Sequence, residues 1–337
     1  MWSMSARRLG AAVLFLFPLS LAAQAEECRL EQVASLDMTQ SDDGLLVPVS
    51  IQGTPKVMII DTGAPISVVD PQAASELKLI THDIFQGIIY TSSGRQFTKM
   101  AVIHGLDIGQ MHASDVRVLV EPGRLSDDSR VAGLLGADFL RHYDIDLDFG
   151  AHKLNLFSQN HCAGKVIYWP ADAVAVVPMN VENSGHITVP VTLDGHEFQA
   201  LFDTGAFGTI ISREAAVNYF GIQPDSSDTP KAGASSSGSP LFKHVFKSLA
   251  LEGIAINNPT IYIHENEAKY AASQSSHTGS MLSSTGTSEG FGDMTLGMNE
   301  LRHLHVFVSY KEEKLYITAA SPPAAAQAPP AATPAPH

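Results

Sequence analysis

The chain has 337 residues, 45 % of them hydrophobic, and its 21 Lys and Arg against 35 Asp and Glu give a formal net charge of −14 at pH 7. This length and composition allow one large domain or two domains of ordinary size with a sizeable apolar core. The acidic balance argues against nucleic-acid binding, because phosphate contacts need a basic face.

The first 25 residues have the pattern of a secretory signal. Arg7 and Arg8 precede an apolar run over residues 9–21, and AQA at residues 23–25 fits an A-x-A cleavage site. The run is too short to span a bilayer comfortably, and no later segment is long and apolar enough to do so. We expect residues 1–25 to be removed and the protein to be exported to the periplasm or outside the cell; an uncleaved anchor is the alternative.

The next segment, residues 26–43, precedes the first folded unit and contains Cys28. Cys162 is the other of the only two cysteines. In an oxidising compartment an isolated pair indicates one disulfide, which would stabilise the fold by about 4–5 kcal/mol in the chain-entropy model. The sequence contains no C-x-x-C and no H-E-x-x-H pattern, so we expect neither a metal site nor a cofactor.

The following elements alternate between strands and a short helix. Residues 45–53 and 56–60 have the pattern of a strand hairpin, and its second, apolar strand ends at Asp61. Asp70, followed by Pro71, has the chemistry of a helix N-cap with proline at the first helical position. The same chemistry recurs later, with Ser as the cap and Gly221 as the matching stop.

An internal repeat relates the two halves of the chain. A shift of 142 residues places residues 47–49 on 189–191 and 61–64 on 203–206, and a shift of 161 places residues 134–157 on 295–318. We therefore predict a first lobe over residues 44–160, a linker over 161–176 and a second lobe over 177–319. The Pro/Ala-rich residues 320–337 have too few apolar groups to form a core and are expected to be a disordered tail.

The repeated Asp-Thr-Gly motif suggests a specific chemistry. If the halves pack about a pseudo-twofold axis, Asp61 and Asp203 meet there. Two carboxylates so close cannot both ionise easily, so one acts as an acid and the other as a base. Such a pair can activate water against an amide carbonyl and protonate the intermediate, without a metal or a covalent nucleophile.

On these residues the chain resembles the aspartic proteases of the pepsin and retropepsin superfamily. The matches are the two DTGA motifs at residues 61–64 and 203–206, LLG at residues 134–136 and a looser TLG at residues 295–297. The resemblance covers roughly residues 44–319. It implies a mostly β, bilobal acid-protease fold with two retropepsin-like β-barrel lobes related by a pseudo-twofold axis.

The resemblance also assigns roles to individual residues. It implies that Asp61 and Asp203 are the catalytic pair, and that Gly136 and Gly297 belong to the segment that crosses behind each Asp-Thr-Gly loop. The residues expected to support the two loops are Thr62, Gly63, Ala64, Thr204, Gly205 and Ala206. Ala64 and Ala206 stand where pepsins carry a hydroxyl that donates to a catalytic carboxylate. Loss of that donor should raise the pKa values of the pair, so we expect a working pH above that of pepsin, in the weakly acidic range.

Members of this superfamily close a hairpin, the flap, over the substrate. Residues 90–97 in the first lobe and 232–242 in the second have turn chemistry at the corresponding places. The flap candidates are Tyr90, Ser93, Gly94, Ser237 and Gly238. An ordinary surface hairpin is the alternative for each.

One further pattern has a less functional interpretation. Asp144, Asp146 and Asp148 alternate along a predicted strand, which spaces carboxylates too far apart for simple chelation, so a solvated face is expected. The equivalent strand carries His305 and Ser309 instead, which suggests no common site.

Taken together, the residues and the resemblance predict an exported aspartic endopeptidase acting on peptides or unfolded proteins. We expect a monomer with an internal pseudo-dimer, with no nucleic-acid partner and no membrane span after signal removal. Two alternatives stay open: a catalytically silent module that binds peptides or proteins, since fold alone does not establish activity, and a homodimer whose lobes pair between chains.

Overall fold

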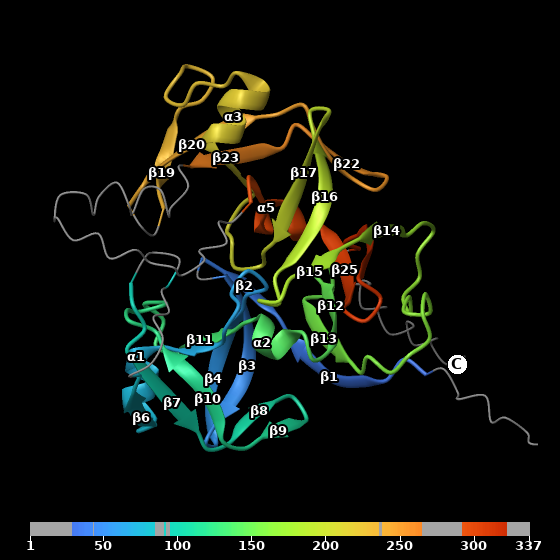
Figure 1. Cartoon of the computed structure of the whole chain (residues 1–337). Helices are drawn as coiled ribbons and strands as arrows, with labels where there is room; N and C mark the ends of the chain where they lie inside the picture. Colours follow the sequence, from blue (N-terminus) through green and yellow to red (C-terminus); the bar gives the residue numbers. More distant parts are fainter. Residues whose placement is uncertain are drawn as a thin grey trace, which may run out of the picture.

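The computed structural model describes residues 29–42, 44–84, 91, 95–235, 238–264 and 292–321. Each lobe is built on one ten-stranded sheet, and a six-stranded sheet joins the two lobes (Figure 1). The predicted mostly β, bilobal fold is confirmed. None of the helices in the described ranges is long and apolar enough to cross a membrane.

The two lobe sheets have the same strand order. The first runs β6 (Ile80–Asp83), β7 (Lys99–Ile103), β10 (Val116–Val120), β5 (Val68–Val69), β11 (Val131–Leu135), β4 (Thr54–Ile60), β3 (Gly44–Ile51), β8 (Leu106–Ile108) and β9 (Met111–Ala113), with β2 (Thr39–Ser41) beside β3. The second runs β19 (Lys231–Ala234), β20 (Pro240–Val245), β23 (Thr260–His264), β18 (Ile210–Ser212), β24 (Met294–Leu296), β17 (His196–Phe202), β16 (Ile187–Leu193), β21 (Ser248–Leu251) and β22 (Ile254–Asn257), with β15 (Asn180–Val181) beside β16. The internal repeat in the sequence is thus a repeat of topology.

Matched turns fix the register of the hairpin that leads to each Asp-Thr-Gly motif. In the β3–β4 hairpin, Gln52 and Gly53 have φ values of 52° and 79°. In the β16–β17 hairpin, Asp194 and Gly195 have φ values of 45° and 87°. Two-residue turns with positive φ at both positions match the twist of the flanking strands. Both hairpins therefore deliver an apolar strand end to the same point of their lobe.

The helices are short and begin as the sequence predicts. They are α1 (Pro71–Glu76), α2 (Ala137–Leu140), α3 (Arg213–Phe220) and α5 (Met298–Leu301). The side chain of Asp70 caps α1 by accepting the N–H groups of Gln72 and Ala73, and Ser212 caps α3 by accepting that of Ala215. Gly221 ends α3 in the left-handed region with φ 67°.

The six-stranded sheet combines strands from both lobes. Its order is β1 (Gln32–Asp37), β13 (Lys153–Phe157), β12 (Asp144–Asp148), β25 (Leu304–Ser309), β26 (Lys314–Ala319) and β14 (Ala175–Pro178). The lobes meet where β12 pairs antiparallel with β25. Residues assigned to the N-terminal segment and to the end of the linker are therefore part of the sheets, while the predicted domain boundaries themselves stay predictions.

The prediction that Asp144, Asp146 and Asp148 form a solvated face is wrong. Asp144 and Asp146 are fully buried, and Asp148 is partly buried. The face is covered because linker residues, among them Val166, pack against this sheet and form a separate apolar cluster with its side chains. A strand pattern alone shows which residues share a face, but not what covers that face.

The strand of the other lobe supplies the partners of these aspartates. Asp144 accepts hydrogen bonds from the hydroxyl of Ser309 (2.9 Å) and the N–H of Tyr310 (3.0 Å), and His161 Nε2 lies 2.5 Å from its Oδ2. Asp146 Oδ1 lies 2.6 Å from His305 Nε2. The inference that the two strands share no site is therefore also wrong, because buried carboxylates require hydrogen-bonded partners.

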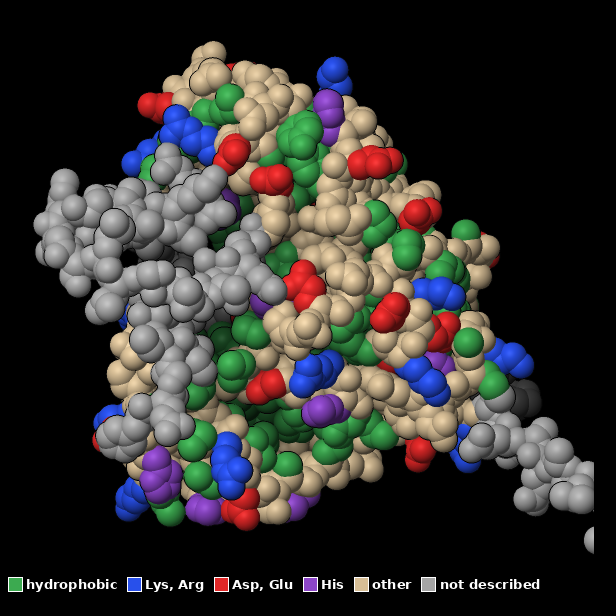
Figure 2. Space-filling model, viewed as in Figure 1, with side chains coloured by type: hydrophobic (Ala, Val, Ile, Leu, Met, Phe, Trp, Pro, Cys, Tyr) green, Lys and Arg blue, Asp and Glu red, His purple; other side chains and the backbone are tan. Residues whose placement is uncertain are grey.

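The surface has no single dominant charge patch on the face seen in Figure 2. Acidic side chains are interspersed there with Lys, Arg and His. The predicted signal peptide and Cys28 lie outside the described residues, as do residues 322–337 of the predicted tail. The signal peptide and the disulfide between Cys28 and Cys162 stay predictions.

Candidate active site

The two Asp-Thr-Gly loops begin where the two most buried strands end. Asp61 follows β4 and donates its N–H to the Leu135 carbonyl of β11 at 3.1 Å. Asp203 follows β17 and donates to the Leu296 carbonyl of β24, also at 3.1 Å. These neighbouring strands are parallel to β4 and β17. Each aspartate is therefore held at a strand end by the same contact from its own lobe.

Thr62 and Thr204 bind the loops to each other. The N–H of Thr62 donates to Oγ1 of Thr204 at 3.1 Å, and the N–H of Thr204 donates to Oγ1 of Thr62 at 3.0 Å. Each hydroxyl also donates across the lobe boundary, Thr62 to the Phe202 carbonyl and Thr204 to the Ile60 carbonyl, both at 2.7 Å. Both threonines are buried, so this reciprocal set fixes one loop relative to the other.

Each loop glycine lies against the carboxyl group of the opposite loop. A Cβ atom added to Gly63 would lie 2.3 Å from Cγ of Asp203, and one added to Gly205 would lie 2.4 Å from Cγ of Asp61. Atoms cannot approach so closely, so only glycine leaves room for the carboxyl groups at these positions. The two carboxyl groups therefore converge on the boundary between the lobes.

Backbone donors orient each carboxylate. Oδ1 of Asp61 accepts the N–H of Gly63 at 3.0 Å. Oδ1 of Asp203 accepts the N–H groups of Gly205 at 2.7 Å and Ala206 at 3.1 Å. The alanine after each glycine thus contributes backbone contacts and no hydroxyl.

Burial and proximity raise the pKa values of both aspartates. Burial raises the pKa of Asp61 well above its usual range, and the negative charge of Asp203 and a hydrogen bond between the two carboxyl groups add to this. Burial also raises the pKa of Asp203, against the N–H donors of its own loop and the hydrogen bond from Asp61. The pair therefore retains a proton at pH values where isolated carboxyls have lost theirs, and Asp61 holds that proton more tightly.

The two late glycines pack directly behind the loops. A Cβ atom added to Gly136 would lie 2.7 Å from the Ala64 carbonyl oxygen, and one added to Gly297 would lie 2.2 Å from that of Gly208. The residues after them donate N–H groups to the loops, Ala137 to the Ala64 carbonyl at 2.8 Å and Met298 to the Ala206 carbonyl at 2.9 Å. This is the place that the sequence resemblance implied for Gly136 and Gly297.

Side chains that sequence reasoning missed support these glycines in the first lobe. The hydroxyl of Ser67 accepts the N–H of Gly136 at 3.0 Å and donates to Oδ1 of Asp138 at 2.6 Å. The same Asp138 oxygen accepts the N–H of Ser67 at 2.9 Å. A single carboxylate therefore anchors both polar groups of Ser67.

The second lobe uses Thr209 in the place of Ser67. Its hydroxyl accepts the N–H of Gly297 at 3.1 Å and donates to Oε2 of Glu300, while its N–H donates to Oδ1 of Asn299 at 2.5 Å. A shift of 142 residues places Ser67 on Thr209. This shared hydroxyl was a sequence signal that could have identified the pair.

The structure describes only parts of the flap candidates. Strands β6 and β7 form the first-lobe hairpin, but Tyr90, Ser93 and Gly94 lie outside the described residues. Strands β19 and β20 form the second-lobe hairpin, where Ser237 is also outside them. Gly238 has φ 84° and donates its N–H to the Ser235 carbonyl at 2.9 Å, so it forms the turn of that hairpin.

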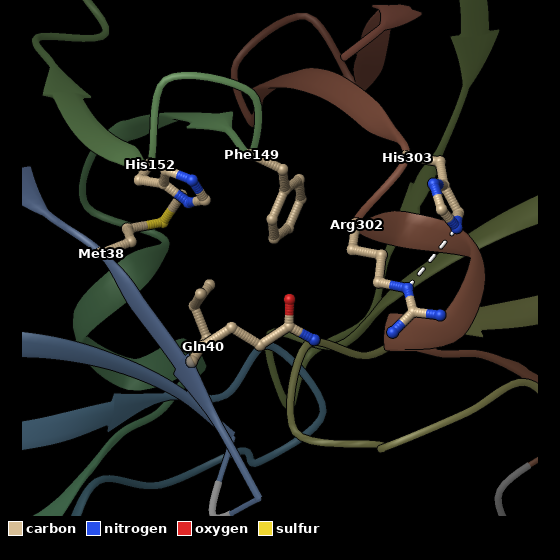
Figure 3. A pocket seen from close by; sticks show the side chains of 7 residues that line it. Met38, Gln40, Phe149, His152, Arg302 and His303 are labelled. Atoms are coloured by element: carbon tan, nitrogen blue, oxygen red, sulfur yellow. Dashed lines mark hydrogen bonds between the residues drawn. The ribbon is translucent and has the colours of Figure 1, made fainter. Parts of the chain in front are cut away.

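A small cavity of about 160 Å³ lies apart from the aspartate pair. Its lining comprises Met38, Gln40, Leu45, Phe149, His152, Arg302 and His303 (Figure 3). None of these residues belongs to an Asp-Thr-Gly loop. Across the described ranges no group of three or more His, Cys, Asp or Glu side chains is arranged to hold a metal ion.

Comparison with known proteins identifies the family. The family model described as aspartyl protease matches residues 47–139 and 189–299, one segment in each lobe and together more than half of the chain. No curated protein sequence matches the chain. Among solved structures, the crystal structure of basic 7S globulin from soybean is similar, with 10% sequence identity, a TM-score of 0.47 and coverage of 87% of this chain and 96% of that one. On the family match over both lobes, this chain belongs to the aspartyl protease family.

Proposed function

We propose that the chain is an active aspartic endopeptidase in which Asp61 and Asp203 activate a water molecule. The observation that carries the proposal is the braced pair of carboxyl groups, with raised pKa values and a shared proton at the boundary of the lobes. All the elements of the brace, Thr62, Thr204 and the two loop glycines, are intact.

The chemistry assigns different roles to the two aspartates. Ionised Asp203 takes a proton from water as the water oxygen bonds to the amide carbon, and protonated Asp61 donates its proton to the carbonyl oxygen. The resulting tetrahedral intermediate collapses when the C–N bond breaks and the leaving nitrogen takes up a proton from the pair. The proton count is restored at the end of the cycle, so neither a metal nor a covalent intermediate is needed.

The surroundings of the pair suit an extended peptide with apolar side chains. Phe207 follows the second loop directly, is 55% exposed and packs edge-on against Tyr262 with ring centroids 4.8 Å apart. An exposed aromatic ring beside a catalytic carboxyl offers apolar contact to a substrate side chain. The flap hairpins offer strand edges to which an extended backbone can hydrogen-bond. We propose peptides or unfolded proteins in the exported compartment as substrates, cleaved at weakly acidic pH by a monomer.

The test is cleavage of a mixed peptide library by residues 26–337, read by mass spectrometry between weakly acidic and neutral pH. Asp61→Asn and Asp203→Asn variants are assayed in parallel. Cuts made by the wild-type chain and by neither variant support the proposal, and the residues flanking them define the specificity. Activity per chain that rises with protein concentration would support the homodimer alternative.

The binding-module alternative predicts a different result. A catalytically silent module would make no cuts at any pH although the protein is folded. It would also hold its peptide partner equally well when either aspartate is replaced by asparagine. A transition-state analogue of the statine type separates the two cases, because its affinity for an active enzyme depends on both carboxyl groups.

A further inference from the structure

The second lobe contains a buried carboxyl group that the first lobe lacks. Glu300 is 4% exposed and lies in α5, whereas the repeat places Phe139 of α2 at the same point. In the first lobe Asp138 alone accepts both polar groups of Ser67. In the second lobe the repeat places Asn299 on Asp138, and the acceptor role is divided between Asn299 and Glu300.

Thr209 connects Glu300 to the segment behind the Asp203 loop. A hydroxyl group has one proton to donate, and that of Thr209 points to Oε2 of Glu300 while its oxygen accepts the N–H of Gly297. Oε1 of Glu300 accepts the side-chain amide of Asn299 at 2.9 Å. Both carboxyl oxygens of Glu300 are thus engaged by groups that hold the Gly297 segment.

The Gly297 segment in turn holds the catalytic loop. Met298, the next residue, donates its N–H to the Ala206 carbonyl at 2.9 Å. Ala206 donates its own N–H to Oδ1 of Asp203 at 3.1 Å. A continuous set of contacts therefore runs from Glu300 through Thr209 and this segment to the carboxyl group of Asp203.

We propose that Glu300 is a positioning residue whose protonation state controls how Thr209, and through it the Asp203 loop, is held. The catalytic consequence of this control rests on the proposed peptidase function, while the control of the loop itself does not. The first lobe has no such carboxyl at the matching place, so the control acts on one side of the pair only.

The electrostatics place this change in the range where the site is proposed to work. Burial raises the pKa of Glu300 to about 7, against the hydroxyl of Thr209 and the positive charge of Arg302. Arg302 caps the end of α5, and its side chain lines the cavity in Figure 3 beside His303. Among the charged side chains of the described residues, Arg302 is the one that favours ionised Glu300.

The two protonation states require different hydrogen bonds. Ionised Glu300 accepts both the Thr209 hydroxyl and the Asn299 amide, which is the arrangement in the structure. Protonated Glu300 must donate a proton itself, and a proton directed at Thr209 would make that hydroxyl turn its own proton elsewhere. The direction of the bond between Glu300 and Thr209 therefore reverses near neutral pH.

An NMR titration tests this control without relying on activity. The backbone amide signals of Thr209 and Gly297 are followed from pH 5 to pH 8.5 in the ¹⁵N-labelled protein. We expect both to shift with an apparent pKa near 7 in the wild type and to lose that shift in Glu300→Gln. Amide shifts that are identical in the wild type and in the variant would overturn the proposal, whether or not the protein cleaves peptides.

The rate profile tests the catalytic consequence. We expect kcat/KM of the wild type to show an inflection near pH 7 that Glu300→Gln loses, while Asp138→Asn in the first lobe keeps it. An inflection that survives in Glu300→Gln would overturn the positioning role. If the wild type cleaves nothing, the proposed function fails, and the amide titration still decides whether Glu300 controls the loop.

A second variant guards against misfolding of Glu300→Gln. Asn299→Asp combined with Glu300→Phe gives the second lobe the residues that the first lobe carries at Asp138 and Phe139. We expect this double variant to fold and to lack the titration near pH 7. A titration of Gly297 that persists in it would contradict the proposal.

Discussion

His305 of the second lobe and Asp146 of the first form a buried pair at the centre of the sheet that joins the lobes. Nε2 of His305 lies 2.6 Å from Oδ1 of Asp146, and the two side chains are almost completely inaccessible to solvent. The imidazole ring also stacks on Trp169 of the linker, with ring centroids 4.0 Å apart. The relative placement of the lobes, and hence of the two catalytic aspartates, depends on this contact.

Replacing His305 by Phe should therefore destabilise the protein by about 3–5 kcal/mol, because it leaves the Asp146 carboxylate buried without its partner. The aromatic ring preserves the stacking on Trp169, so the loss reports the polar contact. Urea unfolding measures the effect. His303→Phe serves as the control, since His303 is exposed, and it should change the free energy of unfolding by less than about 0.5 kcal/mol. An equal loss in both variants would contradict this interpretation.

The hydroxyl groups of Thr62 and Thr204 give the second prediction. Thr62→Val removes the donor to the Phe202 carbonyl and the acceptor of the Thr204 N–H. It should destabilise by about 1–3 kcal/mol for each buried group left unsatisfied. Loss of the brace should also lower kcat by about 10–100-fold. Thermal unfolding and peptide cleavage measure the two effects. Thr62→Ser keeps the hydroxyl, so it should retain most of both properties; a Ser variant as impaired as the Val variant would show that the hydroxyl is not the cause.

The third prediction concerns the space beside the carboxyl groups. Gly63→Ala and Gly205→Ala each place a methyl group within 2.4 Å of Cγ of the opposite aspartate. The carboxyl groups must separate to accommodate it, so kcat/KM should fall by about 100-fold or more. Gly292→Ala is the matched control, because its added Cβ meets only the Gln199 carbonyl oxygen at 3.5 Å. Full activity in Gly63→Ala would mean that the carboxyl groups do not lie as close as described.

The raised pKa values of the aspartates give a prediction about stability. The folded chain keeps a proton on Asp61 at pH values where the unfolded chain has lost it, so this pair makes the fold less stable as pH rises above the unfolded pKa. Asp61→Asn removes that cost. Its unfolding midpoint should exceed that of the wild type at pH 7 and approach it at pH 3, where both aspartates of the wild type are protonated. A variant that is less stable than the wild type at pH 7 would contradict this sign.

Much of the fold and of the site could be predicted from the sequence because the signals are local. Asp70 and Ser212 announce helix starts within one or two residues, and Gly53 and Gly195 mark hairpin turns. The repeat then fixes the rest, since each signal occurs twice at a constant spacing. The convergence of Asp61 and Asp203 followed from that symmetry and from the resemblance of the motifs.

The features that the sequence did not reveal depend on contacts between distant segments. The burial of Asp144 and Asp146 is decided by β25, about 160 residues later in the chain, and by the linker that covers the sheet. Glu300 was missed for a similar reason. Its only signal is that the repeat carries Phe139 at the same point, and a charged residue in a short helix is ordinarily exposed.

The most direct test of the account is kcat/KM for one well-cleaved peptide, measured at weakly acidic pH for the wild type, Asp61→Asn and Asp203→Asn. If the pair activates water as proposed, each variant should lose about 10³-fold or more, because neither aspartate can complete the proton transfers alone. Both variants must first be shown to be folded by thermal unfolding. A folded Asp61→Asn or Asp203→Asn that cleaves the peptide at the wild-type rate would contradict the central claim.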